Sequence, residues 1–459
     1  MALEKRPTLE LRRGSALIIF MVLPLLVALS GFASLQKGLP QWPAALAEVP
    51  ARGAIVARDG TIFAEGRADL RRYPQGRLGA HIIGFSGALQ PDGSYGLEGM
   101  ERSLDSVLQK GHNVTLTIDP TLQAIAQSEL SKAAVSRNAW NGAMIAIESG
   151  SGRILAAASY PEFDPNAFRQ VRNRETFNNR AFLDQVEPGS TVKPLLVAAL
   201  LQEGRLTATE TLAVADHIAV SRHVFRDVME HPPELSVTDI LRFSSNVGTI
   251  MLGSRFTSEE LFLWLRHWGF GRDPKLAYAT TRRGQLNPWE SWVPQDHAST
   301  SIGYSMSVTA LQLAAAYSVF ANDGLYVPPR ILEEVRPEGA RRILSPRIAQ
   351  TVRAMMVEAV ETGEARRAKI PGIAVAGKTG TGQIFVDGGY SKTAYTTSFA
   401  GIFPADNPKV TVVVYLQGAE GPAHELYGSM IAAPIFQAFG SEAMALWGMP
   451  PQAPGYATY

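Results

Sequence analysis

The chain of 459 residues contains no cysteine, which excludes disulfide bridges, zinc sites built from thiolates and cysteine nucleophiles. It also lacks an excess of either charge, because 43 Lys and Arg residues stand against 42 Asp and Glu residues. Nothing therefore points to a nucleic-acid partner. The eight histidines are scattered and form no H-E-x-x-H pair, so we expect no metal and no cofactor. Hydrophobic residues are abundant, at 46%, and predict a sizeable core.

Charge is missing entirely from one long stretch near the N-terminus. Residues 1–13 are polar and basic, and Gly14–Gln36 then runs without a charged residue. A bilayer is spanned by about 20 apolar residues, and a basic flank favours the cytoplasmic side. We predict a cytoplasmic tail at 1–13, a single transmembrane anchor at 14–36, and the rest of the chain outside the cytoplasm. A cleaved signal peptide is the alternative, with Ser30–Ser34 as its site, although the apolar run exceeds a signal core of about 7–15 residues.

Residues 37–113 are predicted to form a linker followed by a small module with little core of its own. The linker, up to about residue 49, is rich in Pro and Ala. In Ala51–Ala64 a turn at Arg58–Gly60 separates two apolar stretches, which predicts a short hairpin. Further turn-rich pieces follow, before a larger domain begins at about residue 114.

The domain at 114–459 shows strand patterns at both ends and mostly helical patterns between them. A helix is expected at 120–135, with Asp119 as its cap, and the middle region from 201 to 366 is expected to be mostly helical, including a buried helix at 309–320. The pattern predicts an α/β (α+β) fold with one five-stranded antiparallel sheet flanked by helices. The expected strands are Gly142–Glu148, Arg153–Ser159, Gly372–Gly377, Tyr395–Phe403 and Val410–Leu416, and Ile431–Trp447 is the expected closing helix.

The centre of the domain is a stretch in which Leu195–Leu201 is entirely apolar, which indicates a buried helix. Ser190 stands at its predicted start, where capping residues are favoured, and Lys193 follows one turn later on the same face. A neutral amine there could take the serine proton, which requires burial or a neighbouring cation such as Lys378 to lower its pKa. The Ser-x-x-Lys pattern alone is loose, and usually means a helix cap followed by a solvated lysine; Ser34–Lys37 matches it too.

Two further polar clusters could serve such a serine. Ser244 and Asn246 lie between helical stretches, where Ser244 could relay a proton and Asn246 could hydrogen-bond a substrate amide. Gly377–Gly382 closes a predicted strand, so that Lys378 lies on this strand, and its glycines would let a substrate backbone approach. Each cluster alone is more often a loop or a cap. Together with Ser190 and Lys193, their order in the chain points to active-serine chemistry.

That order resembles the three-motif signature of penicillin-binding proteins and serine β-lactamases. The chain is most similar to class B penicillin-binding proteins, which are peptidoglycan D,D-transpeptidases with a transpeptidase domain behind a membrane anchor and a pedestal module. Most of the usual pedestal is missing here. Further matching stretches are Arg52–Ile55, Arg72–Pro74, His81–Phe85, Gly96–Glu98, Leu116–Asp119, Ser159–Asn166, Asn179–Ala181, Glu187–Thr191, Ser301–Tyr304, Asn322–Gly324, Ala376–Thr381 and Ala433–Pro434.

The resemblance implies roles for the residues of the first two motifs and for the lysine of the third. Ser190 would attack the penultimate D-Ala carbonyl of a stem peptide, and Lys193 would take its proton. Ser244 and Lys378 would pass that proton to the leaving amine, while Asn246 would hold the substrate amide.

The rest of the third motif would bind the substrate. Thr379 and Thr381 would hold the terminal carboxylate, and Gly380 would let the backbone come close. The backbone N–H groups of Ser190 and Thr381 would form the oxyanion hole. An amine from a second stem peptide would then resolve the acyl-enzyme and make the crosslink.

The resemblance also implies partners and leaves alternatives. Stem peptides, β-lactams, the inner membrane and a SEDS-type glycan polymerase with division proteins are the expected partners. Arg72–Pro74 and His81–Phe85 look more like the septal enzymes, with the elongation type as the alternative. A β-lactam sensor or β-lactamase-like protein is a second alternative. Class A β-lactamases hydrolyse the acyl-enzyme with a Glu that belongs to a Glu-x-x-Leu-Asn motif. In this chain the matching motif would end at Asn287, but Arg283 occupies the position of the Glu, which argues against hydrolysis. A non-catalytic scaffold is a third alternative, which the complete motifs disfavour.

Overall fold

The computed structural model describes residues 51–336, 338–386 and 388–449. The predicted tail, anchor and linker lie outside these residues. Within the described ranges, no helix combines the length and the hydropathy that crossing a membrane requires.

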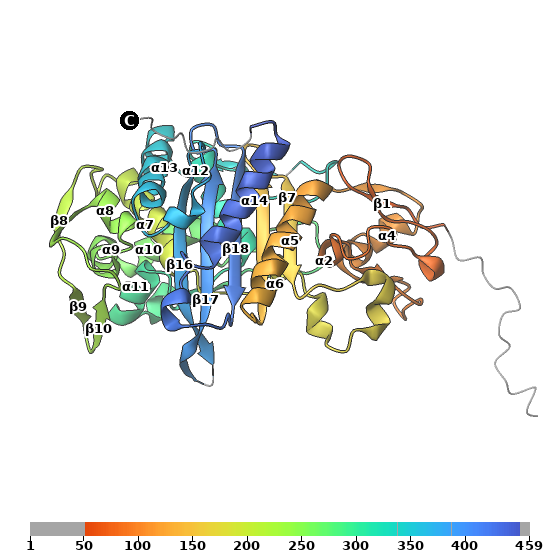
Figure 1. Ribbon diagram of the computed structural model, residues 1–459, viewed down its shortest axis with the longest axis horizontal. Helices are drawn as coiled ribbons and strands as arrows, with labels where there is room; N and C mark the ends of the chain where they lie inside the picture. Colours follow the sequence, from red (N-terminus) through yellow and green to blue (C-terminus); the bar gives the residue numbers. More distant parts are fainter. Residues whose placement is uncertain (1–50, 337, 387, 450–459) are drawn as a thin grey trace, which may run out of the picture. The chain divides into compact units, whose positions relative to one another are not determined.

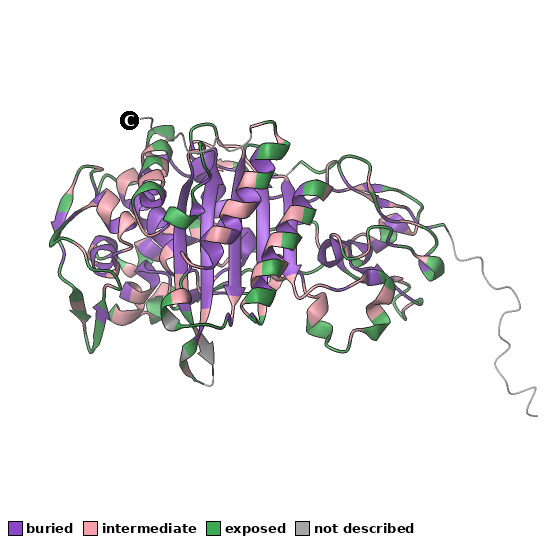
Figure 2. Cartoon of the chain, in the orientation of Figure 1, coloured by how far each residue is buried: buried purple, intermediate pink, exposed green. Residues whose placement is uncertain are grey.

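A five-stranded antiparallel sheet forms the centre of the fold, which confirms the prediction (Figure 1). The sheet combines strands from the beginning of the domain with strands from its end, because β18 pairs with both β17 and β6. In order across the sheet the strands are β16 (Ala376–Val386), β17 (Gly389–Phe403), β18 (Val410–Gln417), β6 (Asn141–Glu148) and β7 (Ile154–Tyr160). The central strands are buried on both faces, as their continuous apolar runs require (Figure 2).

The first strand of this sheet differs from its predicted position. It begins at Ala376 rather than at Gly372 and continues to Val386 rather than ending at Gly377, so the Lys378 motif lies on the strand, as predicted, but not at its end. The glycines of the motif suggested a strand end. They fit within this edge strand because another part of the backbone comes close: a Cβ on Gly380 would lie 2.9 Å from the carbonyl oxygen of Pro188.

Helices cover both faces of the sheet. Helices α5 (Pro120–Ser136) and α14 (Ala432–Leu446) run in front of it in Figure 1, and α12 (Ala310–Ala321) packs against the other face. As predicted, Asp119 caps α5, accepting hydrogen bonds from the backbone of Thr121 and Leu122 at 3.0 and 3.1 Å. The predicted buried helix at 309–320 and the predicted closing helix at 431–447 are confirmed as α12 and α14, whose bounds differ from the prediction by one residue at each end.

The middle region holds the expected helices and also short strands that the sequence prediction missed. Its helices are α7 (Lys193–Gln202), α8 (Val237–Arg242), α9 (Asn246–Gly253), α10 (Ser258–His267), α11 (Pro294–Ser301) and α13 (Pro346–Glu361). Four two-stranded ribbons pair β8 (Thr211–Ala213) with β11 (Glu234–Ser236), β9 (His217–Val220) with β10 (His223–Arg226), β12 (Gln285–Leu286) with β13 (Met306–Ser307), and β14 (Leu325–Tyr326) with β15 (Arg341–Arg342). Runs of two to four residues are too short to show a periodic pattern, which explains the omission.

The N-terminal module contains the predicted hairpin, β1 (Ile55–Val56) with β2 (Ile62–Ala64), and β1 also pairs with β5 (Val114–Thr115). Its other elements are β3 (Phe85–Ser86), β4 (Gly96–Glu98), α2 (Ala80–Ile83), α3 (Gly99–Ser103) and α4 (Asp105–Leu108). The described residues also contain one more short helix and several 3-10 turns: α6 (Arg180–Leu183), η1 (Ala68–Leu70), η2 (Pro165–Gln170), η3 (Arg174–Phe177), η4 (Gly189–Val192), η5 (Trp289–Ser291), η6 (Arg366–Ala368) and η7 (Ala423–Glu425). The apolar side chains of the module belong to the same buried cluster as those of the larger domain.

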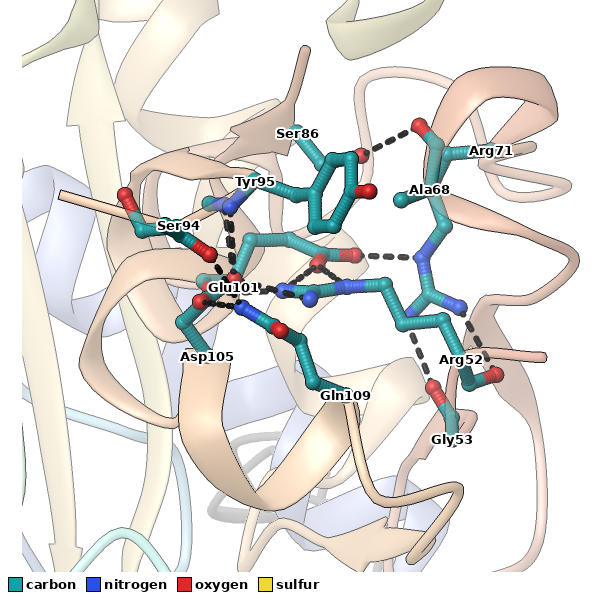
Figure 3. A network of polar contacts seen from close by, with 12 residues as sticks. Arg52, Gly53, Ala68, Arg71, Ser86, Ser94, Tyr95, Glu101, Asp105 and Gln109 are labelled. Atoms are coloured by element: carbon teal, nitrogen blue, oxygen red, sulfur yellow. Dashed lines mark hydrogen bonds and ion pairs between the residues drawn. The ribbon is translucent and has the colours of Figure 1, made fainter. Parts of the chain in front are cut away.

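A buried ion cluster holds this module together (Figure 3). Arg52 lies between Glu101, at 2.7 Å, and Asp105, at 2.8 Å, and Arg71 contacts the other oxygen of Glu101 at 2.6 Å. The side chain of Glu101 is fully buried. Charges so placed are stable only while they stay paired, so these ion pairs fix the first residues of the module against α3 and α4.

Candidate functional site

Ser190 lies in the 3-10 turn η4, which continues directly into α7. It therefore does not cap the helix, contrary to the sequence expectation, and no side chain caps α7. The physical reason is that Gly189, with φ +53°, turns the chain one residue before Ser190, so the helical path begins before α7 itself. The expected burial of α7 is confirmed, since every residue from Lys193 to Leu200 is buried.

Lys193 is fully buried and points at the second motif. Its ammonium nitrogen lies 2.6 Å from the carbonyl oxygen of Ser244, 3.4 Å from the Ser244 hydroxyl oxygen and 2.8 Å from Oδ1 of Asn246. Ser244 has a left-handed backbone, φ +56°, which is unusual for a residue with a side chain.

Burial, and after it the charge of Lys378, lower the pKa of Lys193 from 10.5 to about 7. The carboxylates of Asp227 and Glu364 act in the opposite direction. About half of the Lys193 side chains are then neutral near pH 7, and a neutral amine can accept a proton.

Lys378 and Thr379 of β16 are also buried. The Lys378 ammonium donates to the Thr379 hydroxyl at 3.2 Å and to the Thr379 carbonyl oxygen at 3.1 Å. Burial lowers the pKa of Lys378, while the nearby carboxylate of Glu364 raises it.

Strand β16 and turn η4 lie side by side. A Cβ on Gly189 would come within 3.6 Å of the Thr381 carbonyl oxygen, so the backbones next to Ser190 and Thr381 are close. Thr381 is held on both sides, because its hydroxyl accepts from the backbone N–H of Gly428 at 2.9 Å and its carbonyl accepts from the Tyr304 hydroxyl at 3.3 Å. A side chain on Gly380 would meet the Ser398 hydroxyl at 2.4 Å.

These elements surround a cavity of about 780 Å³. Of the residues predicted from the sequence, Ser190, Ser244, Asn246, Thr379 and Thr381 line it. The two lysines lie behind this surface, and Gly380 lies in the strand between two lining residues. Residues from three separate parts of the chain thus meet at one cavity.

Asp227 is a residue that the sequence analysis missed. It follows β10 and accepts hydrogen bonds from the Ser245 hydroxyl at 2.7 Å, the Val247 backbone N–H at 3.0 Å and the backbone N–H of Asn246. Nε2 of His231 lies 2.8 Å from Oδ2 of Asp227, the oxygen that also accepts from Ser245. Asp227 thereby fixes the start of α9, where the second motif lies. No motif marks it, and only its position after an unrecognised strand could have pointed to it.

Glu364 was missed as well. It lines the cavity between α13 and η6, accepts from the Thr379 hydroxyl at 2.8 Å and lies 3.5 Å from the Lys378 ammonium. Among the described residues, no group of three His, Asp or Glu side chains could hold a metal ion.

Comparisons with known proteins identify the family. Residues 142–440 match the family model of the penicillin binding protein transpeptidase domain. The probable peptidoglycan D,D-transpeptidase PenA of Neisseria gonorrhoeae is 33% identical over 415 residues, covering 84% of this chain and 70% of that protein. The peptidoglycan D,D-transpeptidase FtsI of Escherichia coli is 31% identical over 410 residues, covering 83% and 68%.

Among solved structures, penicillin binding protein 3 of Mycobacterium tuberculosis, complexed with aztreonam, matches with a TM-score of 0.79 and 32% identity. The match covers 88% of this chain and 98% of that one. These matches, together with the motifs around the cavity, show that the chain belongs to the penicillin-binding protein transpeptidase family, as a class B member.

Proposed function

We propose that this protein is a peptidoglycan D,D-transpeptidase that crosslinks stem peptides through a serine acyl-enzyme. The observation that carries the proposal is the buried Lys193 amine, with a pKa of about 7, bonded to Ser244 and Asn246 beside a cavity that Ser190 lines. An ordinary surface lysine would be charged and unable to act as a base at neutral pH.

In the first half of the reaction, the Ser190 hydroxyl attacks the carbonyl carbon of the penultimate D-Ala, and Lys193 accepts the hydroxyl proton. The tetrahedral oxyanion is stabilised by the backbone N–H groups of Ser190 and Thr381, which is supported by the contact between η4 and β16. The proton then passes through Ser244, with Lys378, to the leaving amine. The terminal D-Ala departs, and the ester on Ser190 remains.

In the second half, an amine of another stem peptide attacks the ester carbonyl and gives its proton back along the same route. The new amide is the crosslink, and Ser190 regains its hydroxyl proton.

Substrate contacts are assigned to the remaining motif residues. Thr379 and Thr381 bind the terminal carboxylate in the positive potential of Lys378, and Gly380 lies between the two threonines in β16. Asn246 donates one amide hydrogen to the Arg226 carbonyl at 2.9 Å and accepts from Lys193 through Oδ1. Its second amide hydrogen is free to meet a substrate amide.

The proposal extends to the setting of the enzyme. A single-pass anchor at 14–36, with a cytoplasmic tail at 1–13, would hold a reduced pedestal (37–113) and a transpeptidase domain (114–459) on the outer side of the inner membrane. β-Lactams would acylate Ser190, in line with the aztreonam complex of the mycobacterial relative. A SEDS-type glycan polymerase and division proteins are the proposed partners in septal synthesis.

Covalent labelling tests the central proposal. Membranes containing the full chain are treated with fluorescent penicillin, and we expect a labelled band that disappears in Ser190→Ala. Ser136→Ala is the matched control, because Ser136 is an exposed serine at the end of α5 and should leave labelling intact. Undiminished labelling of Ser190→Ala would refute the proposal.

Two alternatives have separate tests. A β-lactam hydrolase would turn over the bound drug quickly, whereas a transpeptidase keeps the label for long times. An elongation enzyme would place a fluorescent fusion along the sidewall, whereas we expect the fusion at midcell.

A further inference from the structure

Glu364 occupies a position that the proposed reaction does not use. Its carboxylate accepts a hydrogen bond from Thr379, at 2.8 Å, and pairs with Lys378, at 3.5 Å. These are two of the three side chains assigned above to the terminal carboxylate of the acyl donor, the third being Thr381. A carboxylate of the protein itself therefore sits where the carboxylate of a substrate would bind.

The hydroxyl of Thr379 cannot serve both carboxylates at once. A hydroxyl has one hydrogen to donate, and here it goes to Glu364, while the oxygen of the same hydroxyl accepts from Lys378. An incoming carboxylate must take that hydrogen away from Glu364. It must also approach a like charge that is already close to Lys378.

The position of Glu364 is built into the fold. Its backbone N–H donates to the carbonyl of Arg242 at 3.3 Å, and a side chain on Gly363 would come within 2.7 Å of the carbonyl oxygens of Ala359 and Arg242. The loop after α13 is thus packed against two helices. Only 20% of the Glu364 side chain is exposed, and that part faces the cavity.

We propose that Glu364 is a specificity-determining residue that competes with the carboxylate of the acyl donor for the Thr379 hydroxyl and the Lys378 ammonium. The inference rests on the proposed transpeptidase function. It predicts that the site accepts carboxylate-bearing donors less readily than it would without Glu364, and that donors lacking this charge are unaffected by the competition.

The expected size follows from the charges. Two unit charges about 6–12 Å apart, at an effective dielectric constant of about 20, repel enough to change an equilibrium by about 10- to 100-fold. Arg366 and Arg367 line the same cavity and offset part of this repulsion. We therefore expect an effect of about 10-fold.

The test compares benzylpenicillin with its methyl ester, which differ in one charge. The acylation rate of each is measured on the full chain by competition with fluorescent penicillin, and the ratio of the two rates is the readout. Glu364→Gln keeps an oxygen that accepts from Thr379 but removes the charge, so the ratio should rise about 10-fold in favour of the carboxylate. Glu364→Asp keeps the charge and should leave the ratio near that of the wild type.

Glu361→Gln is the matched control. Glu361 ends α13, pairs with Lys369 at 2.7 Å and is outside the lining of the cavity, so the ratio should not change. An unchanged ratio in Glu364→Gln, or equal changes for both compounds, would overturn the inference while leaving the transpeptidase proposal intact. Absence of Ser190-dependent acylation by either compound in the wild type would instead refute the proposed function, and this inference with it.

Discussion

The pKa of Lys193 should set the pH dependence of acylation. The difference between 10.5 and about 7 corresponds to about 5 kcal/mol in favour of the neutral amine. At pH 7 an ordinary lysine would be neutral in about one molecule in 3,000, whereas Lys193 is neutral in about half. The acylation rate should accordingly rise with pH and reach half its plateau near pH 7.

Replacing Lys378 by methionine tests where this pKa comes from. Burial is the largest cause and stays in place, but the charge that lowers the pKa further is lost. Glu364, which raises the pKa of Lys193, then acts without an opposing cation. For any two unit charges about 6 Å apart at an effective dielectric constant of about 20, the repulsion is roughly 2–3 kcal/mol before screening, which sets the scale of the repulsion that is lost. In Lys378→Met the half-plateau should therefore move to higher pH by one unit or more.

The assay is the rate of labelling by a fluorescent penicillin from pH 5 to 9. The position of the rise matters rather than its height, since loss of Lys378 also weakens substrate binding. Lys369→Met is the control, because Lys369 is an exposed lysine paired with Glu361, and its profile should match the wild type. A profile of Lys378→Met that rises at the same pH as the wild type, or lower, would refute the electrostatic reasoning.

Two further predictions concern residues outside the motifs. In Asp227→Asn the side chain cannot accept all the hydrogen bonds that fix the start of α9, so the acylation rate should fall about 10- to 100-fold with little change in melting temperature. The control Asp216→Asn changes an exposed aspartate and should leave the rate unchanged. An unaffected rate in Asp227→Asn would contradict the positioning role. Arg52→Met leaves the buried carboxylate of Glu101 with one partner fewer and should lower the free energy of unfolding by about 3–5 kcal/mol in urea titration, whereas exposed Arg67→Met should cost less than about 1 kcal/mol. Equal losses in the two arginine variants would argue against the buried cluster.

The architecture of the sheet could be predicted because its strands carry long apolar runs. Val410–Gln417 is buried on both faces and shows this as a continuous hydrophobic stretch. The ribbons of two to four residues left no such signal. The end of β16 was misplaced because its glycines were interpreted as the end of a strand, whereas Gly380 allows the approach of the turn that carries Ser190.

The chemical groups of the site could also be predicted from the sequence, since the three motifs contain the nucleophilic hydroxyl, two amines and a set of hydrogen-bonding groups. It did not reveal Asp227 or Glu364. Neither belongs to a local pattern, and each acts on residues that lie 14 to 20 positions away in the chain. Such contacts depend on how loops pack, which single-sequence patterns do not encode.

The sequence by itself determined which functional groups are available, the burial of α7 and the strands of the sheet apart from the bounds of β16. Only the tertiary structure decided that Lys193 meets Ser244 and Asn246, and that Glu364 takes the hydroxyl of Thr379. The physical reason is that local sequence fixes hydrogen-bonding and hydrophobic character, whereas the pKa of a lysine and the partner of a hydroxyl depend on burial and charges brought together by the fold.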